Sequence, residues 1–253
     1  MQIDLTGKKA LITGGSRGIG RAIALRLAAA GADVVINYLR QKSRAEETAE
    51  QIRQFGREAL ILKANVANER NLQQMFNEIQ SRFGKLDILV SNAASGVLKS
   101  ALELTLHHWH WTMDINAAAL IPMAQHLTRI MPPGGPATIV AVSSLGAIRA
   151  IPNYTAVGAS KAALESVIRH LAAELARSNV HVNAVSAGIV ETDALRHFPN
   201  REQLISGSLE KTPAGRLTTP EDVADVVLFL CSPLSTMIHG QTIIVDGGYS
   251  ILG

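Results

Sequence analysis

A tyrosine, a lysine and a serine carry the clearest chemistry in this sequence. Six residues separate Tyr154 from Lys161, so on one helix the phenol and the ammonium approach the same side. An ordinary phenol, with a pKa near ~10, is protonated at neutral pH and can donate a hydrogen bond to a developing oxyanion, whereas a nearby ammonium favours the tyrosinate. Ser144 follows an apolar run, where its hydroxyl either joins this pair or caps a helix. The Tyr154 and Lys161 spacing alone is also compatible with a surface helix and a solvated lysine.

A glycine-rich segment near the N-terminus has the spacing of a phosphate-binding turn. Thr13-Gly-Gly-Ser-Arg-Gly-Ile-Gly20 follows the first predicted strand and opens the first predicted helix. Glycines let the backbone approach a pyrophosphate, and the helix N-terminus offers unpaired N–H groups. The segment therefore predicts a dinucleotide site, and the predicted contacts are Gly14, Ser16, Arg17, Gly18, Ile19 and Gly20.

The second predicted strand indicates which dinucleotide is bound. It ends at Asn37-Tyr38, without the carboxylate that usually binds a free ribose 2′-hydroxyl. Arg17 in the glycine-rich segment and Arg40 just beyond the strand could instead flank a 2′-phosphate. NADPH is therefore the expected cofactor, with Tyr38 and Arg40 among its contacts; the alternative is that Arg40 is simply solvated.

Short β-branched runs alternate with longer stretches of helical period, the pattern of βαβ units around a buried parallel sheet. The sequence predicts an α/β fold: a single doubly wound Rossmann-type domain, 1–253, with a seven-stranded parallel sheet flanked by helices. Residues 193–216, broken by Pro199, Gly207, Pro213 and Gly215, are interpreted as a lid over the site. The seven predicted strands are Ala10–Thr13, Val34–Ile36, Ala59–Leu62, Leu86–Val90, Thr138–Val142, Val180–Val182 and Thr242–Val245.

Composition narrows the class of protein. Hydrophobic residues make up 47% and charged residues 18% of 253 residues, enough apolar material for one large core. A net charge of +3 without a basic block gives no reason to expect nucleic acid, and no run reaches the ~20 apolar residues of a membrane span. The single cysteine, Cys231, and the absence of a signal-like N-terminus lead us to expect a cytoplasmic protein. His108-Trp-His-Trp111 lacks ligand spacing and is interpreted as helix packing at a subunit contact, so no metal is expected.

Taken together, these motifs resemble the short-chain dehydrogenase/reductase family over essentially the whole chain. The resemblance rests on the glycine-rich segment and on Asn65-Val66, Asn92-Ala93, Asn116, Ser144, Lys161 and Val245-Asp-Gly-Gly248. It implies further cofactor contacts by Asn65, Val66, Asn92, Ala93, Lys161, Gly188, Ile189 and Thr192, with Thr192 at the nicotinamide carboxamide or at a phosphate. The sequence departs from the family pattern at Asn65, where aspartate is common, at Ser91 to Ala94, at Ala187 and at Val157.

Longer blocks resemble a narrower group, the NADPH-dependent enoyl-acyl-carrier-protein reductases III of bacteria. They include Asn92-Ala-Ala-Ser-Gly-Val-Leu98, Ser143-Ser-Leu-Gly146, Asn153-Tyr154 with Lys161, and His197-Phe-Pro-Asn-Arg201. The resemblance implies reduction of trans-2-enoyl thioesters in fatty acid synthesis. Ketone reductases of the wider family have only three residues between their tyrosine and the lysine equivalent to Lys161, which would put the tyrosine at position 157, where this chain has a valine.

The resemblance also implies roles for the catalytic candidates. Tyr154 is the expected oxyanion stabiliser and acid, and Lys161 the residue that holds the cofactor and tunes the phenol. Ser144 adds a hydroxyl near the thioester or serves as a turn former. Asn116 anchors a water leading from Lys161 to solvent, or is a buried amide that ties its helix to the sheet.

Two other functions stay open at this stage. The first is a 3-ketoacyl or other carbonyl reductase, against which Val157 speaks; the second is a catalytically silent protein that binds a dinucleotide. For partners, the resemblance implies a homotetramer, with a homodimer as the alternative. Acyl carrier protein is the expected partner that brings the substrate, and the cations expected to meet its acidic surface are Arg196, His197, Arg201, Lys211 and Arg216.

Overall fold

All seven predicted strands occur, in one parallel sheet. The computed structural model describes residues 3–193, 195 and 201–252, and within them the strand order is β3-β2-β1-β4-β5-β6-β7. Every neighbouring pair in this sheet is parallel. The strands are β1 (Lys9–Ile12), β2 (Asp33–Tyr38), β3 (Ala59–Lys63), β4 (Ile88–Ser91), β5 (Ala137–Ser144), β6 (Val180–Ala187) and β7 (Thr242–Val245).

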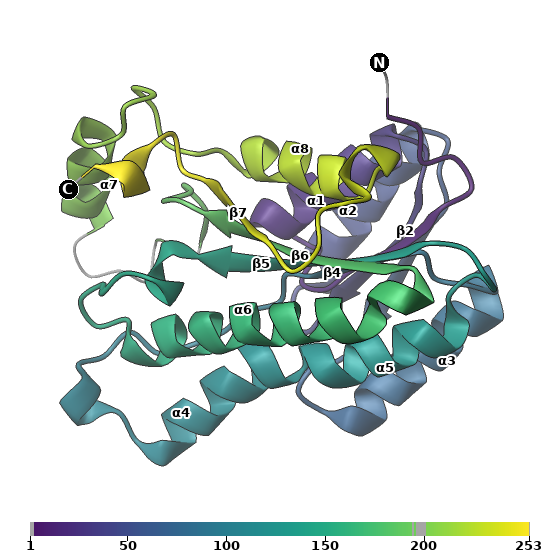
Figure 1. Cartoon of the computed structure of the whole chain (residues 1–253), viewed down its shortest axis with the longest axis horizontal. Helices are drawn as coiled ribbons and strands as arrows, with labels where there is room; N and C mark the ends of the chain where they lie inside the picture. Colours follow the sequence, from purple (N-terminus) through teal and green to yellow (C-terminus); the bar gives the residue numbers. More distant parts are fainter. Residues whose placement is uncertain (1–2, 194, 196–200, 253) are drawn as a thin grey trace.

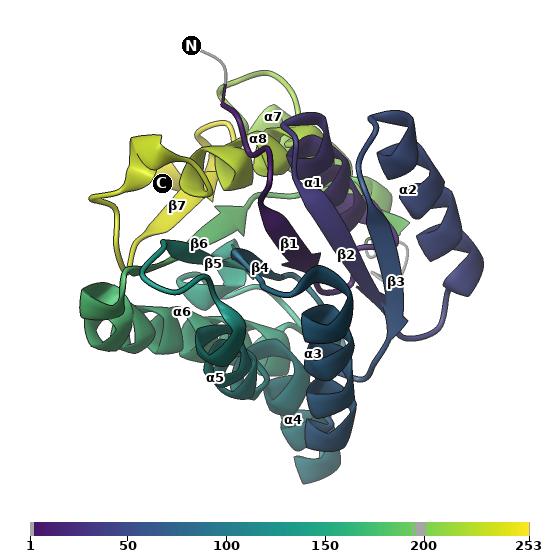
Figure 2. The ribbon, with the colours of Figure 1, turned by 90° about the vertical axis from the view of Figure 1, so that its right-hand side faces the viewer.

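Helices cover both faces of the sheet, as Figure 2 shows. One face carries α1 (Gly18–Ala29), α2 (Lys42–Gln54) and α8 (Pro220–Leu230). The other face carries α3 (Glu69–Phe83), α5 (Leu120–Ile130) and α6 (Thr155–Leu175). Because a parallel sheet buries both faces, two apolar cores form, one on each side of the strands.

Local sequence explains where several of these helices begin and end. The Asn68 side chain accepts a hydrogen bond from the Asn71 N–H and so caps α3, which ends at Gly84 in the left-handed region. The Thr219 hydroxyl and the Asp222 carboxylate form a capping box at the start of α8, where Pro220 occupies the first helical position.

Shorter elements complete the fold. The helix α4 (Leu106–Met113) runs into a π-helical turn, Asp114–Ala118, just before α5. Helix α7 (Arg201–Glu210) lies at the same end of the molecule as the C-terminus and the start of α6 (Figure 1). The remaining short 3₁₀ turns are Ala101–Glu103, Leu145–Ala147, Ala176–Ser178, Pro233–Ser235 and Tyr249–Ile251.

The connectivity fixes where a ligand can bind. From β1 the chain winds outward through β2 and β3 and then returns to place β4 on the other side of β1. In open sheets of this kind, ligands bind outside the carboxyl ends of the strands where the winding reverses, here between β1 and β4. Among the described helices, none is both long and apolar enough to cross a membrane.

Candidate active site

The ends of β1 and β4 are tied together by one hydroxyl. Thr13 Oγ1 donates to the Val90 carbonyl at 3.2 Å and accepts from the N–H groups of Asn92 and Ala93 at 2.9 and 3.0 Å. The Asn92 side-chain amide donates to the carbonyls of Thr13 and Gly14 at 2.9 and 3.2 Å. The predicted residues Asn92 and Ala93 therefore hold the glycine-rich segment against the end of β4.

The glycine-rich segment needs its glycines for two different reasons. Gly14 and Gly18 have φ values of +63° and +53°, which L side chains rarely adopt. A Cβ on Gly20 would collide with the Asn92 amide and the Gly14 carbonyl. Arg17 caps α1 without a side-chain hydrogen bond, and the first turn of α1 has no acidic residue. These features fit a pyrophosphate at the start of α1.

Asn37 stands where a ribose-binding carboxylate is usual in NAD-dependent enzymes, and its side chain contacts the glycine-rich segment. This buried amide accepts from the Gly14 N–H at 3.3 Å and donates to the Ala64 carbonyl at 3.0 Å. It links the glycine-rich segment to the end of β3, close to the predicted contacts Asn65 and Val66. Val66 itself is buried in the core, and Asn65 accepts from the Ala67 N–H at 3.1 Å.

Two arginines near the glycine-rich segment share one carboxylate. Arg17 Nη1 lies 3.7 Å from the Asp193 carboxylate, and Arg44 of α2 forms an ion pair with the same carboxylate. Arg40 is exposed, and Tyr38 is buried. Arg44 lies one helical turn before Thr48, whose hydroxyl donates to the Ser16 carbonyl at 3.5 Å, so α2 meets the glycine-rich segment here. The predicted contacts of Arg17 and Arg40 with the cofactor stay predictions.

The segment after β6 meets the same glycine-rich segment. A Cβ built on Gly18 would lie 3.4 Å from the Thr192 methyl carbon, so Thr192 lies against this glycine. Gly188 packs on Asp246, where a Cβ would come within 2.8 Å of the Asp246 Cβ. The structure thus brings Gly18 and Thr192 together, while Gly188 lies against the C-terminal segment.

Tyr154 and Ser144 face each other at the end of β5. Their hydroxyl oxygens lie 3.4 Å apart. The spacing argument places Tyr154 within a helix. In the structure Tyr154 is instead the residue just before α6. Its ring lies against Gly146, where a Cβ would come within 2.5 Å of the ring. Gly158 allows the same approach, because a Cβ there would lie 2.7 Å from the Gly146 carbonyl oxygen.

Val157 turns toward a different neighbour. A Cβ on Gly96 would overlap the Val157 side chain, so this valine packs against the segment that follows β4. Val157 is 8% exposed. In this structure the position where ketone reductases carry their tyrosine is therefore part of the packing, and the phenol near Ser144 comes from Tyr154.

Lys161 is buried on α6 and reaches the end of β5. It is 6% exposed and donates from Nζ to the Val142 carbonyl at 2.8 Å. Burial lowers the pKa of Lys161 to about 8, and the charge of Glu165 opposes that shift. Lys161 is expected to favour the tyrosinate and so to lower the pKa of Tyr154. Burial dominates instead and raises the pKa of Tyr154, and the hydrogen bond with Ser144 opposes the rise. The phenol is therefore a proton donor at neutral pH.

Asn116 lies in the π-helical turn and ties three segments together. Its carbonyl oxygen accepts from the Ser95 N–H at 2.8 Å, and its amide donates to Ser160 Oγ at 2.9 Å. Ser160 Oγ in turn donates to the Val157 carbonyl at 2.7 Å. These contacts agree with the structural alternative for Asn116; the water-anchoring role stays a prediction.

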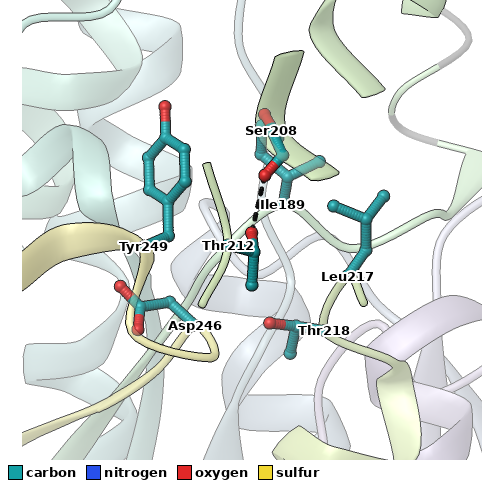
Figure 3. Close-up of a pocket in the computed structure, with 7 residues that line it drawn as sticks. All are labelled: Ile189, Ser208, Thr212, Leu217, Thr218, Asp246 and Tyr249. Carbon is teal, nitrogen blue, oxygen red and sulfur yellow. Dashed lines mark hydrogen bonds between the residues drawn. The ribbon is translucent and has the colours of Figure 1, made fainter. Parts of the chain in front are cut away.

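Part of the predicted lid borders a small pocket, shown in Figure 3. Thr212 donates to the Ser208 carbonyl at 2.6 Å, and the Asp246 carboxylate accepts from the N–H groups of Gly248 and Ser250 at 2.9 and 2.8 Å. The pocket is lined by Ile189, Ser208, Thr212, Leu217, Thr218, Asp246 and Tyr249. The predicted residue Ile189 thus faces α7 and the C-terminal segment.

Two of the cations predicted to meet a carrier protein pair with carboxylates of this chain. Arg201 pairs with Glu191, and Arg216 forms two hydrogen bonds to Asp222 at 2.5 and 2.8 Å. Lys211 is exposed. Arg196 and His197 lie outside the described residues.

His108 has a local role that its sequence setting did not suggest. Its Nδ1 accepts from the Thr105 N–H at 3.3 Å while Thr105 Oγ1 accepts from the His108 N–H at 3.2 Å. The two residues close a capping box at the start of α4. Trp111, on the same helix, is 37% exposed. The predicted subunit contact stays a prediction.

Comparisons with known proteins agree with this fold. The family model described as enoyl-(acyl carrier protein) reductase matches residues 14–250. The chain belongs to the short-chain dehydrogenase/reductase family. It is an oxidoreductase of that family with a nicotinamide cofactor site, and the predicted family and fold are confirmed.

Individual relatives point to more than one substrate. The 1-cyclohexenylcarbonyl-CoA reductase of Streptomyces collinus is 39% identical, over 96% of this chain and 86% of its own. The hydroxynaphthalene reductase-like protein Arp2 of Metarhizium robertsii is 37% identical, over 97% and 96% of the two chains. A short-chain dehydrogenase from Burkholderia cenocepacia, solved in complex with NADP, superposes with a TM-score of 0.89 at 35% identity, over 97% and 99% of the two chains.

Proposed function

We propose that this protein reduces trans-2-enoyl thioesters with NADPH. The observation that carries the proposal is the phenol of Tyr154 beside Ser144, with Val157 packed against Gly96 at the position where ketone reductases carry tyrosine. A ketone receives hydride on the carbon that bears its oxygen. An enoyl thioester receives it at Cβ, and the negative charge develops on an oxygen further along the conjugated system. A shifted proton donor suits the second reaction.

The side chains supply what the developing charge requires. When bound, NADPH provides the hydride for Cβ. As the new C–H bond forms, the electrons of the Cα=Cβ bond move toward the thioester and leave an enolate oxygen. Tyr154, kept protonated by burial, donates a hydrogen bond to that oxygen, and Ser144 supports the phenol. A proton taken up from the solvent at Cα completes the reduction.

The cofactor site supports NADPH in particular. The glycine-rich segment and the start of α1 suit the pyrophosphate, and Arg17 with Arg44 offers two guanidinium groups for the 2′-phosphate. Lys161 would hydrogen-bond the nicotinamide ribose. The NADP-bound relative supports the same choice of cofactor.

The proposal includes coenzyme A as the group that carries the acyl chain. The compound in the name of the Streptomyces collinus relative is itself a conjugated enoyl thioester of coenzyme A, which supports a coenzyme A substrate. Acyl carrier protein is the alternative carrier, in keeping with the family description. Because Arg201 and Arg216 already pair with carboxylates of this chain, an acidic carrier would have to compete for them. The predicted homotetramer is likewise proposed.

Carbonyl reduction is the second candidate, and the Arp2 relative favours it. In that reaction the proton donor must reach the oxygen on the carbon that accepts hydride. Val157 cannot serve as that donor, so Tyr154 would have to do so from three residues earlier in the chain.

One assay separates the candidates. The loss of NADPH absorbance is followed with crotonyl-CoA, with 1-cyclohexenylcarbonyl-CoA and with acetoacetyl-CoA, and mass spectrometry identifies each product. We expect turnover of the two enoyl thioesters. Turnover of acetoacetyl-CoA alone would replace the proposal with carbonyl reduction, and binding of NADPH without turnover of any thioester would indicate a silent dinucleotide-binding protein.

A further inference from the structure

A buried carboxylate lies one helical turn beyond Lys161. Glu165 is on α6 and is 8% exposed. Residues four apart on a helix share one face, so Glu165 and Lys161 lie on the same side of α6. A buried carboxylate costs free energy unless it is hydrogen-bonded or paired, and its presence beside the site calls for a reason.

The partner of Glu165 is the residue before Ser144. Ser143 Oγ donates to Glu165 Oε1 at 2.6 Å. Along an extended strand, successive side chains point to opposite faces, so Ser143 turns toward α6 while Ser144 reaches Tyr154. Lys161 donates to the carbonyl of Val142, the residue just before Ser143. Three consecutive residues at the end of β5 therefore hold the carboxylate, the ammonium and the phenol.

We propose that Glu165, held by the Ser143 hydroxyl, is the counter-charge of Lys161 and a positioning residue for the reaction proposed above. It acts through the lysine, because its own carboxylate accepts the hydrogen bond of the Ser143 hydroxyl. This role goes beyond the proposed enoyl reduction but rests on it, since it assumes that Lys161 holds the nicotinamide ribose.

The charge state of Lys161 decides what it can bind. An ammonium has three N–H donors, and a neutral amine has fewer. One donor is already used on Val142. With a pKa of about 8, Lys161 is mainly an ammonium at neutral pH, and Glu165 is the charge that opposes its neutralisation by burial. Without that charge the lysine would lose its proton at a lower pH.

The other titratable groups on the elements around α6 have other contacts or are exposed. The strand β5 carries no titratable side chain. His126 of α5 stacks on Phe76, His181 of β6 lies beside His239, and Asp114 is exposed. The remaining titratable or charged groups on α6 and the described elements packed against it are Tyr154, His107, His108, His110, Arg129, Arg169, His170, Glu174 and Arg177.

The test replaces the charge while keeping the shape. Glu165→Gln retains an acceptor for Ser143, and Glu165→Asp retains the charge but shortens the side chain. Glu174→Gln, at an exposed position of the same helix, is the matched control. Two quantities are measured against pH: kcat with crotonyl-CoA and the Kd of NADPH from fluorescence.

For the wild type we expect both quantities to worsen as the pH rises through about 8. In Glu165→Gln the alkaline limb should move down by about 1 pH unit, so that kcat near pH 8 falls ~5 to 10-fold while kcat near pH 6 stays within ~2-fold of the wild type. Glu165→Asp and Glu174→Gln should keep the wild-type limb. A purely structural role predicts the reverse order, with Glu165→Asp the more damaged protein and equal losses at every pH.

An unchanged alkaline limb in Glu165→Gln, in both quantities, would overturn the proposal. If no thioester is reduced, enoyl reduction fails, but the NADPH binding curves still decide the role of Glu165. If Glu165→Gln does not fold, Ser143→Ala takes its place: loss of the hydroxyl loosens the carboxylate and should move the limb the same way by a smaller amount. No movement in that variant would also contradict the proposal.

Discussion

The two sides of the site hold their charges in opposite surroundings. On the substrate side, Lys161 and Glu165 are 6% and 8% exposed and are held by the end of β5. On the cofactor side, the side chains of Arg17 and Arg44 are 49% and 44% exposed and share Asp193, at 25%. The first group is set by burial and the second is open to solvent and salt.

This difference changes what each charge can do. Burial shifts the pKa of Lys161 to about 8 because water no longer solvates the ammonium. Exposed ion pairs such as Arg44 and Asp193 contribute little to stability, with a typical value of ~0 to 1 kcal/mol. Their guanidinium groups are free to exchange one anion for another. We therefore expect substitutions on the buried side to change kcat and the pH dependence of the protein, and substitutions on the exposed side to change cofactor affinity alone.

The largest effect should come from Tyr154→Phe. Removal of the phenol hydroxyl takes away the proposed donor to the enolate oxygen, and kcat with crotonyl-CoA should fall at least ~10-fold and up to ~10²-fold or more. NADPH affinity, measured by fluorescence, should stay within ~2-fold because the hydroxyl faces Ser144. A near wild-type kcat would remove Tyr154 from the mechanism and with it the catalytic meaning of the buried side.

Much of the buried side could be predicted from the sequence. The strands and the pair Tyr154 and Lys161 have local signatures, namely apolar runs and a fixed spacing. The strand β6 is longer than predicted because its polar residue Asn183 is satisfied inside the fold: its amide donates to the Ile238 carbonyl at 2.6 Å and its oxygen accepts from the Gln241 N–H at 3.0 Å. Such long-range partners leave no local pattern.

The residues that sequence reasoning missed have the same explanation. In the sequence Glu165 is one more polar residue of a helix, and only the fold brings it to the Ser143 hydroxyl. Arg44 is on α2, and only the fold brings it to Asp193, 149 residues away in the chain. Arg40 is predicted from its place directly after β2, and its contact with the cofactor stays a prediction. Spacing predicts which element carries a side chain but not which neighbour the side chain meets.

Gly146→Ala tests the position of the Tyr154 ring on the buried side without removing any functional group. A methyl group at this position would lie within 2.5 Å of the Tyr154 ring, so the ring must move away from Ser144. We expect kcat to fall about 10-fold, with a loss of stability of ~1 to 3 kcal/mol from overpacking. Thermal unfolding and steady-state kinetics measure the two effects.

Gly207→Ala is the matched control for that change. Gly207 is in α7 and no atom lies near its hypothetical Cβ, so the alanine should leave kcat unchanged and slightly stabilise the helix. Equal kinetics for Gly146→Ala and the wild type would show that the phenol does not need its present position.

On the exposed side, Arg44→Gln should raise the KM for NADPH by about 5 to 10-fold and leave the KM for NADH nearly unchanged, because only NADPH carries the 2′-phosphate. Arg40→Gln tests the pair expected from sequence. A larger NADPH effect at Arg40 than at Arg44 would mean that Arg40 turns toward the phosphate when the cofactor binds. Equal changes in the two KM values would mean that neither arginine recognises the 2′-phosphate.

The smallest effect should come from Asp193→Asn. The Asp193 carboxylate pairs with both Arg17 and Arg44, the groups proposed to bind the 2′-phosphate, and so competes with it. Removal of that charge should lower the Kd of NADPH by ~2 to 3-fold at low ionic strength, the scale of an exposed ion pair. The gain should fade at high salt, where exposed charges are screened.

Asp225→Asn is the control, because its partner Arg26 is in the last turn of α1, far along the helix from the glycine-rich segment. Weaker NADPH binding in Asp193→Asn would mean that Asp193 orders the arginines for the phosphate, so that this side, like the buried one, depends on a fixed counter-charge.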